Sequence, residues 1–117
     1  MTFRDWLDKQ TVKRSNRLKG SSGVKNELGS FIKNQLFEEL NLNDGMSLSV
    51  QASSNHMCCP RETIRNNYKY EEVEVYSHGV YINELVNYAS ETRFTYGYVP
   101  VEIMEELVEK HGGIKEG

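Results

Sequence analysis

The segment Asn55–Glu62 has the sequence NHMCCPRE and concentrates the residues best suited to chemistry. It holds both cysteines of the 117-residue chain, Cys58 and Cys59, and one of its three histidines, His56. Thiolate and imidazole are the ligands that zinc prefers, and binding them would stiffen a loop that has little apolar content of its own. The segment therefore predicts a zinc site, structural rather than catalytic, because no general base or substrate position stands out beside it.

A tetrahedral zinc ion needs four ligands, so this site must draw on residues elsewhere in the chain. The candidates are two histidines and two carboxylates: His78, His111, Asp44 and Glu62. Two other interpretations stay open. The cysteines can be small buried hydrophobes in a packed turn, or one of them can be a nucleophile that His56 or His78 activates.

The charge of the chain is unevenly distributed. Residues 1–25 hold seven Lys and Arg against two Asp, a net charge of +5, whereas residues 26–117 hold seven against fifteen Asp and Glu, a net charge of −8. A basic arm on an acidic body indicates a polar macromolecular partner such as nucleic acid, although an ordinary solvated face has the same composition. The candidate phosphate contacts are Lys13, Arg14, Arg17 and Lys19.

Seven tyrosines lie within the 31 residues from Tyr68 to Tyr98. Tyrosine is enriched at recognition surfaces because it offers a large contact area and a polar tip at a small cost in entropy. Packing in a small core is the alternative for most of them. We expect Tyr76 and Tyr81 to be among the contacts with a partner.

The composition favours a soluble protein of the cytoplasm. No apolar run approaches the ~20 residues needed to span a bilayer, and the polar start MTFRDWLDKQ does not resemble a signal peptide. Two cysteines in a reducing compartment are more often thiols or metal ligands than a disulfide. A chain of 117 residues suits one domain with a modest core.

The first part of the chain predicts helices. Thr2 is a suitable cap for a short helix over residues 3–10, and residues 15–23 form a polar, Gly- and Ser-rich break. Apolar residues recur at helical spacing over residues 24–40, and Asn41–Gly45 supplies a turn. Residues 1–42 are therefore predicted to be a basic helical part.

After this turn the apolar pattern alternates. It predicts strands at residues 46–52, 71–77 and 93–99, a short helix at 81–89, and a final helix at 101–113 that begins after Pro100. Gly97 marks a bulge or a close approach. The predicted fold is α+β, with N-terminal helices followed by a small three-stranded, mainly antiparallel sheet and two helices. We expect residues 46–117 to form this α+β module and to make one compact unit with residues 1–42.

Residues 46–114 carry a distinctive set of motifs: MSLSVQASSNHMCCPRE, YEEVEV and YASETRFTYGYVPVEIMEELVEKHGGI. This set resembles small accessory proteins of phages and prophages of Firmicutes. In those proteins a strand leads to a His-containing loop that ends in Pro-Arg, and a YGYVP strand precedes a helix closing on HGGI. The shared positions are His56, Pro60–Arg61 and His111–Ile114; the cysteine doublet is not among them, which weakens the metal site.

The resemblance implies a context more than an activity. Short phage proteins of this kind are often anti-defence factors, and some streptococcal phage examples look like anti-CRISPR proteins against the type II RNA-guided nuclease; at least one is a zinc metalloprotein. We therefore expect a non-enzymatic inhibitor that binds a host defence protein in the host cytoplasm. The alternatives are a nucleic-acid-binding regulator that uses residues 1–25 and a small cysteine-dependent enzyme.

Overall fold

The computed structural model describes residues 1–20, 36–62, 70–91 and 94–116, with the side chains of residues 17–20 left out. The elements in chain order are α1 (Phe3–Gly20), β1 (Leu40–Asn41), β2 (Ser47–Gln51), β3 (Glu72–Tyr76), the 3₁₀ helix η1 (Asn83–Tyr88), β4 (Thr95–Pro100) and α3 (Val101–Lys110). The predicted α+β class is confirmed. Within the described residues the sheet has four strands instead of the predicted three.

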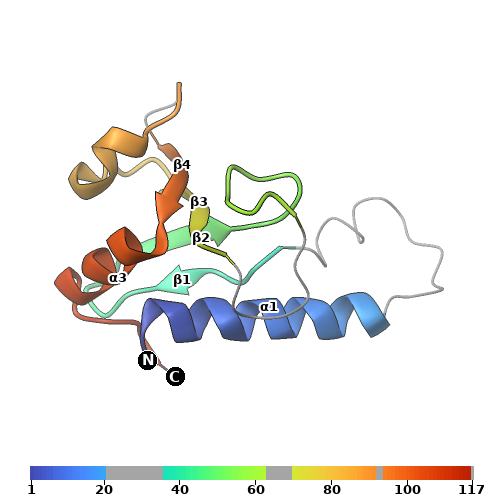
Figure 1. The fold of residues 1–117 in the computed structure, drawn as a ribbon. Helices are drawn as coiled ribbons and strands as arrows, with labels where there is room; N and C mark the ends of the chain where they lie inside the picture. Colours follow the sequence, from blue (N-terminus) through green and yellow to red (C-terminus); the bar gives the residue numbers. More distant parts are fainter. Residues whose placement is uncertain (21–35, 63–69, 92–93, 117) are drawn as a thin grey trace.

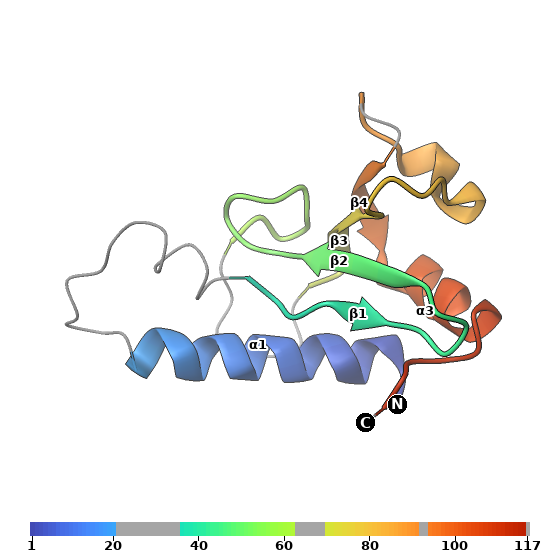
Figure 2. The ribbon, with the colours of Figure 1, turned by 180° about the vertical axis from the view of Figure 1, so that it is seen from behind.

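The sheet is antiparallel throughout, in the order β1-β2-β3-β4. A bridge between Leu42 and Ile114 and a hydrogen bond of 2.8 Å from the Lys115 amide to the Asn41 carbonyl place the C-terminal segment along β1. Both ribbon views show α1 running beside β1 and η1 lying at the opposite end of the molecule (Figures 1 and 2). Among the described residues, no helix has both the length and the apolar character needed to cross a membrane.

The second predicted helix, at residues 24–40, lies mostly outside the described residues. Its described end is wrong, because residues 36–39 are not helical and Leu40 belongs to β1. The Gln51 side chain accepts a hydrogen bond from the Phe37 amide (2.8 Å) and donates one to the Phe37 carbonyl (3.2 Å). These tertiary hydrogen bonds satisfy the backbone groups that a helix would have paired internally.

Helix α1 begins as predicted and ends later. The Asp5 amide donates to Thr2 Oγ1 (3.1 Å) and the Thr2 amide to Asp5 Oδ2 (3.4 Å), a reciprocal cap at the helix start. The predicted break at residue 15 is wrong, because the helix continues to Gly20. The buried polar side chains of the helix are Gln10, Thr11, Arg14 and Ser15 among the described residues, and the contacts of Arg14 hold the helix against the rest of the molecule.

One hydrophobic core joins the two predicted parts of the chain. Phe3 and Leu7 of α1 belong to the same buried cluster as Leu48 of β2 and Leu107 of α3. Helix α3 is amphipathic as predicted, with its buried face made of Val101, Met104, Leu107 and Val108. Its end is also as predicted, with Gly112 and Gly113 at φ of 86° and 90°.

Candidate functional site

The loop after β2 is folded around Ser53. The Ser53 hydroxyl lies 2.6 Å from His56 Nδ1 and accepts a hydrogen bond of 3.1 Å from the Asn55 amide, which is the turn chemistry that serine favours. His56 is half-buried, and this burial lowers its pKa; Glu74 opposes the shift and Arg14 adds to it. His56 is therefore a largely neutral ring held by a serine hydroxyl.

The two cysteines lie in different environments. Cys58 is 1% exposed, and its thiol donates to the carbonyl oxygens of Ser53 (3.2 Å) and Pro60 (3.4 Å). Cys59 is exposed, while its backbone pairs with Glu72. Burial is the main cause that raises the pKa of the Cys58 thiol, so this thiol stays protonated and lacks the activation of a nucleophile.

The loop is docked on β3 and β4. The Met57 amide donates to Glu74 Oε1 (3.2 Å), and the Tyr98 amide donates to the Met57 carbonyl (2.9 Å). A Cβ atom at Gly97 would lie 2.8 Å from Met57 Sδ. The close approach predicted for Gly97 is therefore confirmed, and it leaves room for Met57 against the strand.

The other two histidines bind carboxylates. His78 Nε2 pairs with Glu39. The centre of its ring lies 5.0 Å from the centre of the Tyr76 ring, and the two rings are arranged edge to face. His111 Nδ1 pairs with Asp44 Oδ2, and its Nε2 lies 3.0 Å from Glu84 Oε2. We name His111 with Asp44 and Glu84 the His111 clamp.

The His111 clamp requires a charged imidazole. Ionised carboxylates only accept hydrogen bonds, so both ring nitrogens must donate. Burial of the ring opposes its charge, but the hydrogen bonds to Asp44 and Glu84 outweigh this and the pKa of His111 is raised. The clamp joins the β1–β2 turn, η1 and the end of α3.

The five predicted metal ligands do not converge on one point: His56 and Cys58 both contact Ser53, whereas His78 and His111 lie elsewhere with their carboxylates. Only one of the two cysteines is buried. In the part of the chain that the structure describes, no three His, Cys, Asp or Glu side chains are grouped as metal ligands. Zinc binding by these residues would require their side chains to exchange the partners described above, and the zinc site stays a prediction.

The predicted basic contacts divide between surface and interior. Lys13 is exposed and pairs with Glu38 at 3.0 Å. Arg14 is 1% exposed: it donates to the Ala52 carbonyl and to the Tyr70 hydroxyl (2.8 Å), and its guanidinium lies 4.5 Å from the centre of the Phe37 ring. The structure therefore places Arg14 in the interior, away from the surface that a phosphate contact needs. The side chains of Arg17 and Lys19 lie outside the described residues.

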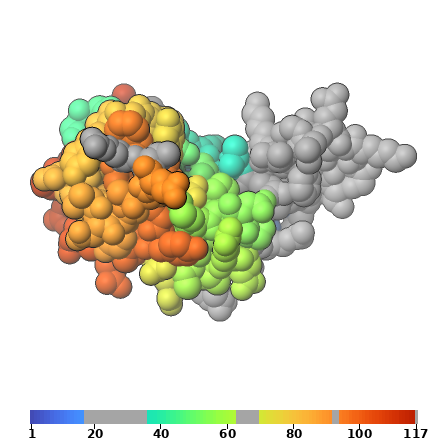
Figure 3. All heavy atoms as spheres, turned by 90° about the horizontal axis from the view of Figure 1, so that it is seen from above, coloured from blue at the N-terminus to red at the C-terminus, as the bar shows by residue number. Residues whose placement is uncertain are grey.

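The tyrosines divide in the same way. Tyr70 and Tyr96 are buried in the core, whereas Tyr76 and Tyr81 are 44% and 52% exposed. The segment that carries the last two lies beside the start of β4, and gold and orange atoms gather on the face seen from above (Figure 3). Tyr68 lies outside the described residues.

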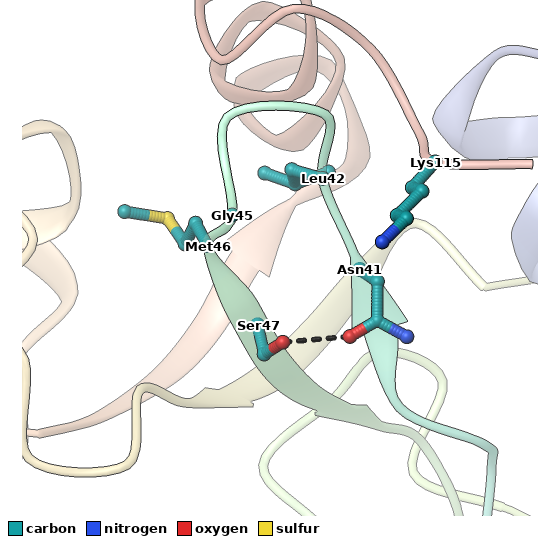
Figure 4. A pocket seen from close by; sticks show the side chains of 6 residues that line it. All are labelled: Asn41, Leu42, Gly45, Met46, Ser47 and Lys115. Atoms are coloured by element: carbon teal, nitrogen blue, oxygen red, sulfur yellow. Dashed lines mark hydrogen bonds between the residues drawn. The ribbon is translucent and has the colours of Figure 1, made fainter.

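Two grooves flank the C-terminal segment. One, of about 370 Å³, is lined by Asn41, Leu42, Gly45, Met46, Ser47 and Lys115. In it the Ser47 hydroxyl donates to Asn41 Oδ1 (2.6 Å), and the Lys115 ammonium lies over Asn41 (Figure 4). The other, of about 460 Å³, lies between α1 and this segment and includes Trp6, Lys9 and Lys13. The grooves offer amide, hydroxyl and ammonium donors, and sequence reasoning missed them because residues far apart in the chain form them.

The chain matches no protein-family model, no curated protein and no solved structure in comparisons with known proteins. Its function must therefore follow from the geometry of the described residues, together with the motifs of residues 46–114. The features available for function are the hydrogen-bonded loop of residues 53–60, the charged His111 clamp and the exposed tyrosines.

Proposed function

We propose that the chain is a phage-encoded, non-enzymatic inhibitor that binds a host defence protein in the host cytoplasm. The partner that the motifs of residues 46–114 suggest is the type II CRISPR effector nuclease. Binding would block the loading or the cleavage of target DNA by occupying a surface that DNA or a moving domain needs.

The observation that supports this proposal is the exposure of Tyr76 and Tyr81. Both were expected to contact a partner, and each is about half exposed, whereas Tyr70 and Tyr96 are buried. A half-exposed tyrosine keeps a large apolar area in water, which binding to a protein would remove. Tyrosines at interfaces commonly carry a large share of the binding energy.

Two further observations favour protein binding over the alternatives. The thiol of Cys58 is buried and has a raised pKa, which is the reverse of what a cysteine nucleophile needs. Arg14 is buried, and Lys13 pairs with Glu38. The basic arm therefore offers fewer free phosphate contacts than its sequence predicts, which weakens the case for direct binding of nucleic acid.

A pull-down with the effector nuclease and a DNA-cleavage assay test the proposal. We expect the chain to co-purify with the guide-loaded nuclease and to reduce cleavage as its concentration approaches that of the nuclease. A gel shift with duplex DNA at low salt is the control for the nucleic-acid alternative, since phosphate binding weakens steeply with salt. Undiminished cleavage at excess protein removes the proposal.

A structural zinc that braces the loop from His56 to Pro60 is a separate part of the proposal. Protein purified without a metal-affinity tag is then expected to contain about one zinc ion per chain. His56→Ala or Cys58→Ser should release the metal and lower the melting temperature, because structural zinc contributes directly to folding. If the purified protein contains no metal and its melting temperature does not change in chelator, the zinc proposal is removed. Cys58 is then a small buried hydrophobic residue in a packed turn.

A further inference from the structure

Strand β3 ends at Tyr76, and the ring of this tyrosine packs against the ring of His78. The centres of the two rings are 5.0 Å apart, and their planes meet at 78°. Edge-to-face ring pairs attract each other beyond the area that they bury, because the positive edge of one ring lies on the negative face of the other. Tyr76 is nevertheless 44% exposed, so the contact orients the tyrosine without covering it.

A tight turn brings His78 back beside Tyr76. The Val80 amide donates to the Ser77 carbonyl (3.2 Å), and the two residues between them, His78 and Gly79, have φ of 56° and 87°. Positive φ at both central positions is the arrangement of a type I′ turn, in which asparagine and glycine are the usual residues. Histidine is uncommon in this backbone region, and a residue held there points to a role for its side chain.

A carboxylate from a distant part of the chain binds the same imidazole. His78 Nε2 pairs with Glu39, which precedes β1 and lies 39 residues earlier in the chain. The backbone of Tyr76 is fixed as well, because it pairs with Ser49 of β2 on one side and with Thr95 of β4 on the other. The His78 ring is therefore held by Glu39 at one nitrogen, and it lies against a tyrosine whose backbone belongs to the sheet.

We infer that His78, held by Glu39, positions the Tyr76 ring for contact with the partner. A half-exposed tyrosine with no ring beside it populates several χ1 rotamers, and binding then costs the entropy of selecting one of them. A ring that is already fixed avoids this cost, so the partner binds more tightly without any new contact. His78 is a positioning residue, because its effect passes through Tyr76. Contact with the partner rests on the proposed function, whereas the fixed ring is a property of the free chain.

NMR of the free chain tests whether His78 fixes the Tyr76 ring. Scalar couplings that report χ1 of Tyr76 should show one rotamer in the wild type and averaging in His78→Asn, since asparagine accepts the left-handed φ of this turn but has no ring. Glu39→Ala should also cause averaging, because it removes the acceptor for His78 Nε2. Glu39→Gln keeps an oxygen acceptor there and should keep the single rotamer.

The matched control in the same spectra is Tyr98, which is 45% exposed. Its couplings should be the same in the wild type and in all three variants. A single rotamer of Tyr76 in every variant, averaging of Tyr76 already in the wild type, or an equal change at Tyr98 would each overturn the positioning role.

A double-mutant cycle on binding to the guide-loaded nuclease tests the consequence for affinity. Tyr76→Ala should lower the affinity at least about fivefold, and His78→Asn should lower it about threefold, as expected when one more side chain has to be ordered on binding. Because His78 acts through Tyr76, adding His78→Asn to Tyr76→Ala should cause no further loss. Additive losses would mean that His78 contacts the partner itself, which contradicts the positioning role.

The two measurements separate failure of the positioning role from failure of the proposed function. A Tyr76 ring that His78 fixes in a chain without affinity for the nuclease removes the proposed function and keeps the fixed ring. Inhibition of the nuclease that Tyr76→Ala impairs and His78→Asn leaves unchanged keeps the inhibitor and removes the positioning role.

Discussion

Arg14 and His111 both join elements through charge, and they do so in opposite surroundings. Arg14 is enclosed by α1, the end of β2 and the aromatic rings of Phe37 and Tyr70. His111 lies at the end of α3 between two partly exposed carboxylates. Hydrogen bonds to a buried cation are costly to remove because water cannot replace them, whereas water and salt can compensate at the surface. Burial should therefore rank the effects of breaking each contact.

The largest effect is expected for Arg14→Met. It leaves the Ala52 carbonyl and the Tyr70 hydroxyl without their donor in the interior, and the free energy of unfolding should fall by about 3 kcal/mol. Urea unfolding followed by circular dichroism measures the change. Arg14→Lys should recover part of the loss, because one ammonium cannot reproduce two separated donors. A variant as stable as the wild type would show that this cation contributes no net stability.

A smaller effect is expected for Glu105→Gln. The Glu105 carboxylate on α3 accepts hydrogen bonds from the amides of Phe3 (3.2 Å) and Arg4 (2.6 Å), so a distant residue caps the positive end of α1. Loss of the charge should cost about 1 kcal/mol in the same experiment. Glu106→Gln, on the exposed side of α3, is the matched control and should be close to neutral. Equal changes at the two positions would contradict the capping role.

The His111 clamp should contribute less to the free energy of unfolding than Glu105 does, and its contribution should depend on pH. The raised pKa of His111 adds stability that is complete below the ordinary histidine value of 6.5 and is lost as pH rises through the folded-state pKa. The hydrogen bonds to His111 are the main cause that lowers the pKa values of Asp44 and Glu84. The stability from these carboxylates is present above their ordinary values of 3.8 and 4.5 and is lost as pH falls.

Unfolding of wild type and His111→Asn across pH measures this contribution. The difference between them should be largest between pH 4.5 and 6.5, where all three groups of the clamp are charged in both the folded and unfolded chain. It should shrink at alkaline pH and in high salt. A difference that grows above pH 8 would mean that a neutral His111 stabilises the fold by packing instead.

The smallest effect is expected for Lys13→Met. Lys13 and Glu38 form a pair with side chains 51% and 57% exposed, and such pairs contribute roughly 0 to 1 kcal/mol. The free energy of unfolding should therefore change by less than about 0.5 kcal/mol. A loss comparable to that of Arg14→Met would show that exposure does not rank these contacts.

The regular elements predicted from sequence are those whose pattern is local. Alternation predicted β2, β3 and β4, and the helical period after Pro100 predicted α3. The two-residue strand β1 was missed because it exists only through its pairing with β2. The extension of α1 to Gly20 was missed because its Gly- and Ser-rich composition favours a loop, while the contacts of Arg14 favour the helix.

In the candidate site, too, local features could be predicted from the sequence and contacts between distant residues could not. Successive side chains of an extended backbone point to opposite sides. Cys58 and Cys59 agree with this rule, because Cys58 is buried and Cys59 is exposed. Nothing in the sequence indicates that His111 meets Asp44, 67 residues earlier, or that Gln51 holds Phe37. These pairs depend on the path of the chain, which local patterns do not encode.

The sequence by itself determined the α+β class, three of the four strands among the described residues, the start of α1 and the helix that ends at the glycine pair. Those features follow from backbone preferences and apolar period, which act between near neighbours. Only the tertiary structure decided that Arg14 is buried, that the histidines bind separate partners, and that Tyr81 is exposed while Tyr70 and Tyr96 are buried. The physical reason is that burial of a side chain depends on which distant elements cover it. Arginine and tyrosine occur both in protein interiors and on surfaces, so the residue type alone does not indicate which.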